Sequence, residues 1–390
     1  MMATAAQAWS PAVPQSADGR DSGAYRVARE LRLQTDGPRL SGYTLGIAPD
    51  WRVGVDVTTF LRDAEFMMPY TRGYTATGFF VAPYATRAVG ERAQLTLGLR
   101  LAGVAGYPGL RRWWPLVRME YAPHDNVRLV MGSLYGTLSH GLYEPMLDRE
   151  RWVYDPYEEG VQILATLPLG GTRWHTDTWL YWEELLEPWQ PRQERFTLGS
   201  VHEWQLTGVD GHSPFALSIP LSFLGSHRGG QFSALDTCIQ SLFNESVALR
   251  ASMAMGRRSA LAVDVPLFLY QDVSPEKWQA FPDGWGFWPH LSFDGTLVPV
   301  TGDRDWRMLL QAGYWRGSHF IAPRGSYLFQ SVSWHKPDFA APDRRMLTAK
   351  AAVENRYGST FALGLDAEFY YDMDLRGLDI AFGLYMRYRP

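Results

Sequence analysis

The sequence predicts an all-β protein, a transmembrane antiparallel β-barrel of about 14 to 18 strands with long loops on one side. Three observations lead to this prediction. Apolar and polar residues alternate along many segments, these segments are longer than typical soluble strands, and tight turns alternate with longer polar connections. In such a barrel the apolar faces form the outer wall, and the polar faces line the lumen.

Composition agrees with one large folded unit. The chain has 390 residues, 46% of them hydrophobic, and a formal net charge of −4 from 37 basic and 41 acidic residues. This composition excludes wholesale disorder and gives no sign of a nucleic-acid partner. Aromatic residues reach 14%, with 16 Trp and 20 Tyr, which suits either a girdle at a membrane interface or an aromatic core or sugar-binding surface. The single cysteine, Cys238, excludes an intramolecular disulfide.

The first residues of the chain resemble part of a signal peptide rather than a barrel strand. Ala6-Gln7-Ala8 resembles the small-residue end of a signal peptide, but the charged and apolar regions that should precede it are missing. We expect residues 1–24 to form a flexible N-terminal segment, either a signal-peptide remnant or a disordered tail. Residues 25–390 are then expected to form the barrel. No run of apolar residues is long enough for a transmembrane helix, which needs about 20.

Strand predictions rest on period-two alternation. In residues 94–101, for example, every second residue is leucine, and the residues between them are Gln94, Thr96, Gly98 and Arg100. Such segments run about eight to eleven residues, the length that a tilted strand needs to cross a bilayer. A soluble β-sandwich or propeller is the alternative, but its strands would be shorter and its inner face more apolar. The other clear segments are 51–58, 361–369 and 378–388.

Connections of two kinds separate these segments. Tight-turn sequences occur at Ala48–Asp50, Pro123–Asn126, Gly170–Gly171 and Tyr357–Ser359. Longer polar stretches occur at about 139–158, 183–195 and 270–305. Short turns at one end and long loops at the other are typical of bacterial outer-membrane barrels.

The segment from Gly132 to Gln162 is the most distinctive stretch, because charged residues crowd there among aromatic residues, glycines and prolines. We expect a long structured loop that folds toward the lumen and forms a constriction that selects solutes by charge. A solvated loop with weak local salt bridges is the alternative. Residues 225–231, GSHRGGQ, add a histidine and an arginine that either hold an anionic group or merely flank a turn. The candidate lumen residues are Glu144, Asp148, Arg149, Glu150, Arg151, Glu158, Glu159, His227 and Arg228.

Motifs for catalysis are weak. Glu183 and Glu184 lie among tryptophans, which suggests a glycosidase, but adjacent strand residues face opposite ways and cannot flank one bond. His202 and Glu203 lack the second histidine of a zinc-protease motif. Ser139 and His140 are neighbours, but adjacency does not make a catalytic pair, and a hydrolase of this class would assemble its Ser–His pair in space. We therefore expect no enzymatic activity, no cofactor and no metal.

Several stretches together resemble a largely uncharacterised family of porin-like outer-membrane β-barrels from Bacteroidota. They are spread from about residue 40 onward: Pro69-Tyr70 with Gly73-Tyr74, Gly132–Gln162, Ser226–Gln231, Tyr314–Ser331 and the alternating C-terminal segment. The resemblance implies an integral outer-membrane barrel and no established substrate or catalytic residue. One departure is the C-terminus, where Arg389-Pro390 follow the last aromatic residue.

Three functions are compatible with these features. The first is porin-like passage of small polar solutes across the bacterial outer membrane, with membrane lipid and lipopolysaccharide around the barrel. The second is a plugged barrel that acts as a scaffold or partner subunit in an envelope complex. The third is a secreted, soluble glycan-binding or hydrolytic β-protein.

Overall fold

The computed structural model describes residues 51–185, 193–209, 213–230, 238–256, 259–298, 304–357 and 360–388. The expected N-terminal segment, and residues 25–50 of the expected barrel, lie outside this part. In the described part, no helix is long and apolar enough to cross a membrane. The strands are β1 (Arg52–Glu65), β2 (Tyr74–Val89), β3 (Ala93–Val104), β4 (Arg112–His124), β5 (Val127–Ser133), β6 (Glu159–Leu169), β7 (Thr172–Glu184), β8 (Glu194–Gln205), β9 (Phe215–Gly229), β10 (Gln240–Ala254), β11 (Ala260–Asp272), β12 (Asp283–Phe287), β13 (His290–Val298), β14 (Arg304–Ser318), β15 (Asp343–Tyr357), β16 (Phe361–Asp372) and β17 (Gly377–Tyr388).

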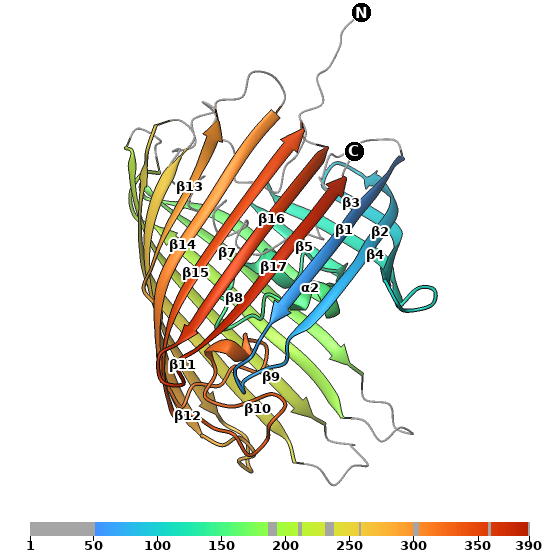
Figure 1. Cartoon of the computed structure of the whole chain (residues 1–390). Helices are drawn as coiled ribbons and strands as arrows, with labels where there is room; N and C mark the ends of the chain where they lie inside the picture. The colour runs from blue at the N-terminus through green and yellow to red at the C-terminus, as the bar shows by residue number, and fades with distance from the viewer. Residues whose placement is uncertain are drawn as a thin grey trace, which may run out of the picture.

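The strands form one closed antiparallel barrel (Figure 1). Each strand pairs with its neighbours in the sequence, and β1 closes the sheet by pairing with both β2 and β17. Strands β12 and β13 occupy one position in the wall, because both pair with β11 and with β14. The break between them falls at Trp288-Pro289, where proline has no N–H for the ladder. Counted as one strand, they give the barrel 16 positions, which confirms the predicted fold class and range.

Side-chain alternation matches the prediction in every segment that the structure describes. On β16, Leu365 is 57% exposed on the outer wall, whereas Asp366 beside it is 5% exposed on the inner wall. The same division separates Leu97 from Thr96 on β3. The outer wall is therefore apolar, as a lipid-facing surface requires.

The two ends of the barrel differ as predicted. Gly170 and Gly171 form a tight turn with φ values of +54° and +88°, which glycine adopts without strain. The C-terminal end of β17 lies at the upper end in Figure 1. The antiparallel strand order puts that turn at the same end and the connection between β14 and β15 at the opposite end, which we call the loop end. The predicted loop 270–305 is too long, because β12 and β13 lie within it. Their short length and the Trp288-Pro289 break weaken the strand pattern there.

The chain leaves the wall early at β5, which has only 7 residues. Gly132, with φ +92°, bends the end of this strand, and a Cβ atom there would lie 2.2 Å from the Val117 carbonyl oxygen. The following residues, 134–158, fold into the lumen and include the 3₁₀ turn η1 (Thr137–His140) and the short helix α2 (Arg151–Tyr154) (Figure 1). We call residues 134–158 the plug loop.

The inside of the barrel is less polar than predicted. Apolar side chains of the plug loop, such as Leu138, Met146 and Trp152, pack with inward wall residues such as Phe268 and Trp315 in one buried cluster. The connection between β14 and β15, which carries η2 (Tyr327–Phe329), adds Phe320 and Phe329 to the same cluster. The lumen therefore contains a hydrophobic core as well as charged groups.

Candidate functional site

The plug loop reaches the wall on several sides of the barrel. The Tyr370 hydroxyl of β16 donates to Glu144 at 2.6 Å, and the Lys350 ammonium group of β15 also donates to it. The Tyr143 hydroxyl donates to Asp264 of β11 at 2.8 Å. Because these contacts lie on separate strands around the barrel, the loop spans the lumen rather than lining one side of it.

Two arginines and three carboxylates of the wall and the plug loop form a dense network near β1. The Arg62 side chain, which is 1% exposed, donates from Nε to Glu150 at 3.1 Å and from its terminal nitrogens to Asp366 and Glu368 at 2.9 Å. The Arg149 guanidinium group binds Glu368 at 2.7 Å. Such buried pairs fix the loop in position, because separating them would leave charges without partners in a dry environment.

His140 holds the loop to β7. Its Nδ1 atom lies 2.8 Å from an Asp177 carboxylate oxygen, its Nε2 atom lies 2.9 Å from Glu158, and its ring stacks on Trp179 at 3.5 Å. Burial alone would lower the pKa of His140, but the Asp177 and Glu158 carboxylates raise it to about 9. Both ring nitrogens are therefore occupied, which leaves neither of them to activate Ser139.

The connection between β14 and β15 locks against the plug loop. The backbone N–H of Asp148 donates to the Arg324 carbonyl at 2.6 Å, and the Arg324 side chain donates to Glu158 at 3.2 Å and to Glu183 at 2.5 Å. Burial would raise the pKa of Glu158, but His140 and Arg324 lower it to about 2. The two inward segments therefore form one structure across the loop half of the lumen.

The structure gathers seven of the nine predicted lumen residues in or beside the plug loop. Six lie on the loop itself, and Glu159 begins β6, where the Arg100 guanidinium group binds it at 3.2 Å. His227 and Arg228 lie elsewhere, near the end of β9. His227 faces outward rather than into the lumen, which corrects its predicted position. The loop members are Glu144, Asp148, Arg149, Glu150, Arg151 and Glu158.

The two glutamates that suggested a glycosidase differ in their hydrogen bonds but share an ion-pair partner, since Arg195 Nε lies 3.8 Å from Glu183. Glu183 accepts hydrogen bonds from Thr197 and Arg324, whereas Glu184 binds Arg195 at 2.8 Å. Trp179, one of the tryptophans near these glutamates, is 2% exposed and packs inside the barrel rather than in a girdle.

His227 pairs with Ser241 on the membrane-facing side of the wall. The two residues are direct cross-strand partners on β9 and β10, and His227 Nδ1 lies 2.9 Å from Ser241 Oγ. Ser241 faces outward because its neighbour Leu242 belongs to the buried cluster inside the barrel. The His227 ring lies 4.9 Å from the ring of Phe196, which in turn stacks on Trp182.

This pair lies at the level of an aromatic girdle. On the outer face of β7 and β8, Trp182 and Phe196 form the girdle toward the loop end, and Trp174 and Trp204 form its counterpart toward the turn end. Since His227 is the register partner of Phe196, the Ser241–His227 pair belongs to the loop-end girdle. Girdle aromatics mark the boundary between lipid chains and water.

A second polar cluster lies between the two girdles. Ser200 Oγ lies 2.9 Å from His202 Nε2 and 2.6 Å from Thr178 Oγ1, which is 3.3 Å from Thr176 Oγ1. All four side chains point outward, where the wall is otherwise apolar. At this depth the surrounding medium is hydrocarbon, so mutual hydrogen bonding satisfies the three hydroxyl groups and His202 Nε2, which have little access to water.

Comparison with known proteins decides the family. A family model described as lipid A 3′-O-deacylase-type matches residues 46–390. The chain belongs to the lipid A 3′-O-deacylase-type family. This membership overturns the prediction of a protein without enzymatic activity. No curated protein matches the chain.

Solved structures show the fold that this deacylase-type chain shares with other outer-membrane proteins. OprB of Pseudomonas putida is 8% identical, with a TM-score of 0.51, over 96% of this chain and 100% of that chain. A loop-deletion mutant of OmpT, an outer membrane protein of Vibrio cholerae, is 8% identical, with a TM-score of 0.50, over 87% of this chain and 99% of that chain. The deacylase-type chain is therefore an integral barrel of the bacterial outer membrane, and the resemblance to an outer-membrane barrel family is confirmed at that level.

Neither outward Ser–His pair is among the residues predicted from the sequence, although the first pair could have been found from it. Ser200 and His202 are two residues apart on one strand, so the alternation rule alone places them on one face. Ser241 and His227 are brought together only by the register of β9 against β10, which no local pattern reveals.

Proposed function

We propose that the protein hydrolyses an acyl ester of lipid A at its membrane-facing wall, with Ser241 as the nucleophile and His227 as the general base. Family membership supports the substrate class and the reaction. The 2.9 Å contact between Ser241 Oγ and His227 Nδ1 carries the assignment of the site. A nucleophile and a base within hydrogen-bond reach are the minimum that this chemistry requires.

The depth of the pair favours this site over Ser200 and His202. The ester groups of a lipid lie near the boundary between headgroups and hydrocarbon, and the loop-end girdle marks that boundary. Long loops in such barrels face the cell exterior, so this girdle lies on the outer-leaflet side. Hydrolysis also consumes water, which is present at the boundary and scarce between the girdles.

The reaction proceeds through an acyl-enzyme. Ser241 Oγ attacks the ester carbonyl carbon while His227 Nδ1 takes the hydroxyl proton. The carbon–oxygen bond to the lipid A hydroxyl then breaks, and protonated His227 returns the proton to the departing oxygen. A water molecule next attacks the acyl group with His227 again as base, which releases the fatty acid and restores Ser241.

Packing around the histidine keeps it in position. The Phe196 ring covers one side of the imidazole, and a Cβ atom placed on Gly229 would lie 3.2 Å from His227 Nε2. The absence of a side chain at Gly229 therefore leaves room for the ring on its other side.

The test is release of fatty acid from purified lipopolysaccharide, followed by mass spectrometry of the lipid A product. Wild-type protein in detergent micelles is expected to remove one acyl chain. Ser241→Ala is expected to lower the rate by about 1,000-fold or more, while Ser200→Ala keeps the wild-type rate. Activity that survives Ser241→Ala but is lost in Ser200→Ala would refute the assignment.

Passage of small polar solutes is the second candidate. It is favoured by the size of the barrel, because walls of about 16 strands enclose an aqueous channel in porins, and by the charged groups that the plug loop places in the lumen. The constriction role of these residues, and an origin in Bacteroidota, stay predictions. Conductance across a planar bilayer tests this candidate.

A further inference from the structure

Two arginines face outward beside each other at the loop end of the wall. Arg316 of β14 and Arg345 of β15 are direct cross-strand partners, and both are exposed. They lie on the outer face, because the neighbouring residues Trp315 and Arg344 are buried inside the barrel. The two positive charges are therefore presented on the membrane-facing side of the wall.

These arginines lie at the loop-end margin of the apolar belt. The next outward residues toward the turn end are Tyr314 on β14 and Leu347 on β15. Leu347, and Leu310 further along β14, are exposed apolar side chains of the outer wall. The polar headgroups of a bilayer begin where its hydrocarbon ends, so arginines at this margin meet the phosphate groups of outer-leaflet lipids.

Arg316 is the member of the pair without a carboxylate partner. Arg345 donates to Asp374 at 2.6 Å, and Asp343 lies two residues away on the same face of β15. Arg316 forms no ion pair within the part of the chain that the structure describes. Its guanidinium carbon lies over the Trp285 ring, 5.9 Å from the centroid. Its N–H groups are therefore left for a phosphate, which arginine can bind through two parallel hydrogen bonds.

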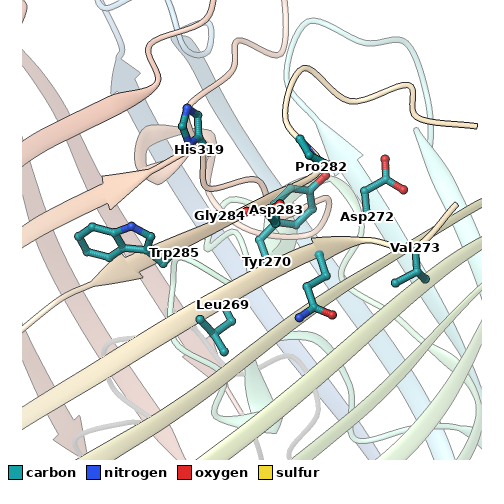
Figure 2. A pocket seen from close by; sticks show the side chains of 10 residues that line it. Leu269, Tyr270, Asp272, Val273, Pro282, Asp283, Gly284, Trp285 and His319 are labelled. Carbon is teal, nitrogen blue, oxygen red and sulfur yellow. The ribbon is translucent and has the colours of Figure 1, made fainter.

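Trp285 also lines a pocket of about 570 Å³ that lies where β11 ends and β12 begins. Its outer-face lining includes two cross-strand pairs, Leu269 with Trp285 and Gln271 with Asp283. All four side chains are exposed, and Figure 2 shows Leu269, Asp283 and Trp285 in the lining. An amide and a carboxylate beside an aromatic ring suit a sugar, because its hydroxyl groups need donors and acceptors while its apolar face packs on the ring.

The pocket reaches the proposed nucleophile on its other side. Val273 lines the pocket, and the Val273 N–H donates to the Ser241 carbonyl at 2.9 Å. Ser241, the pocket and Arg316 therefore follow one another across β10, β11, β12 and β14. These three strand steps span about 15 Å of the outer face, since neighbouring strands lie about 4.8 Å apart.

We propose that Arg316 binds a phosphate group of a phosphorylated saccharolipid in the outer leaflet, with the sugar in the pocket and the acyl ester at Ser241. The last part rests on the proposed function, because it takes the bound lipid as the substrate. Arg345 adds positive charge at the same point, although Asp374 partly neutralises it. A lipid that lacks either the phosphate or the sugar loses one of the two contacts.

Native mass spectrometry of the full chain in detergent micelles tests this. To prevent turnover, binding is measured with the Ser241→Ala variant. We expect it to retain phosphorylated lipid A at least about ten-fold better than enzymatically dephosphorylated lipid A. Phosphatidylglycerol, which carries a phosphate but no sugar, is also expected to be retained less well than phosphorylated lipid A. Equal retention of phosphatidylglycerol would contradict the assignment to a saccharolipid.

Arg316→Gln in the same background is expected to remove most of the preference for phosphorylated lipid A. Arg87→Gln is the matched control, because the exposed Arg87 lies over the Trp51 ring at 5.8 Å and stands at the turn end of the wall. It removes the same charge from a similar contact and is expected to leave the preference intact.

Equal retention of phosphorylated and dephosphorylated lipid A by the parent variant would overturn the inference, even if wild-type protein hydrolyses lipid A. An equal loss of the preference in Arg316→Gln and Arg87→Gln would also overturn it. A preference that depends on Arg316, without any hydrolysis by wild-type protein, would instead leave the lipid site and refute only the proposed function.

Discussion

Arg62 shows how single residues fix the inside of this barrel. Its guanidinium group is buried and contacts three carboxylates, one from the plug loop and two from β16. Removing one partner of a buried ion pair leaves the other charges uncompensated, which is far more costly than losing a solvated pair. Arg345 and Asp374 provide the contrast, because their pair lies on the exposed rim, with Arg345 55% exposed.

Arg62→Met is expected to lower the free energy of unfolding by about 3–5 kcal/mol. Arg345→Met is the matched control and should change it by no more than about 1 kcal/mol. Urea unfolding in lipid vesicles, followed by gel mobility of folded and unfolded forms, measures both. Equal stability of the two variants would show that Arg62 does not hold the loop.

A second residue-scale prediction concerns the outer wall. Leu365→Arg places a charge on the lipid face of β16 and is expected to cost about 2–4 kcal/mol in the same assay. Leu365→Met, which keeps the side chain apolar, should cost less than about 1.5 kcal/mol. Gly364 is unsuitable as an inward control, because a Cβ atom there would lie 2.1 Å from the Tyr385 ring. Tolerance of arginine at Leu365 would argue against membrane insertion.

At the scale of elements, the plug loop depends on the charge of His140. Burial opposes that charge, but Asp177 and Glu158 raise the pKa of His140 to about 9, above the usual value of about 6.5. A raised pKa means that the stabilisation is fully present below the unfolded value and is lost as pH rises through the folded value. Between these two values the loop is therefore expected to loosen progressively.

Hydrogen exchange of residues 134–158 measures this loosening. Protection is expected to be high near about pH 6 and to fall as pH approaches about 10. In His140→Gln, protection should be lower at the acidic end and nearly independent of pH over this window. The turn at Gly170–Gly171, at the opposite end of β6 from the plug loop, serves as the internal reference. Wild-type protection that is flat across the window would contradict the role of His140.

The sequence predicts the strands and loops better than it predicts the contacts between them. Alternation in residues 361–369 is visible because each residue on a strand takes the opposite face from its neighbours. The inward fold of the plug loop is also predictable from its crowded charges. The wall residues that the plug loop contacts are not predictable, because the partners are far apart in the sequence. Glu150 and Arg62 are 88 positions apart, and Glu144 and Tyr370 are 226 apart. The Ser241–His227 pair could not be predicted either, because it depends on the register of β9 against β10.

At the scale of the whole molecule, the barrel is of porin size but is not a simple pore. The plug loop and the connection between β14 and β15 pack into one buried cluster within the lumen. Replacing residues 138–156 with a short Gly-Ser linker is expected to raise the conductance of the protein in planar bilayers several-fold over wild type. Unchanged conductance would mean that the loop does not control passage.

At this scale, we propose that hydrolysis takes place on the outside of the barrel, at the outer-leaflet girdle. Covalent capture of the nucleophile tests that claim most directly. A long-chain alkyl fluorophosphonate, which reacts with activated serines, is added to the protein in lipopolysaccharide-containing vesicles, and the labelled peptide is identified by mass spectrometry. We predict one adduct on Ser241 that disappears in His227→Gln. Labelling of Ser200, or of a serine inside the barrel, by protein that hydrolyses lipid A would contradict it.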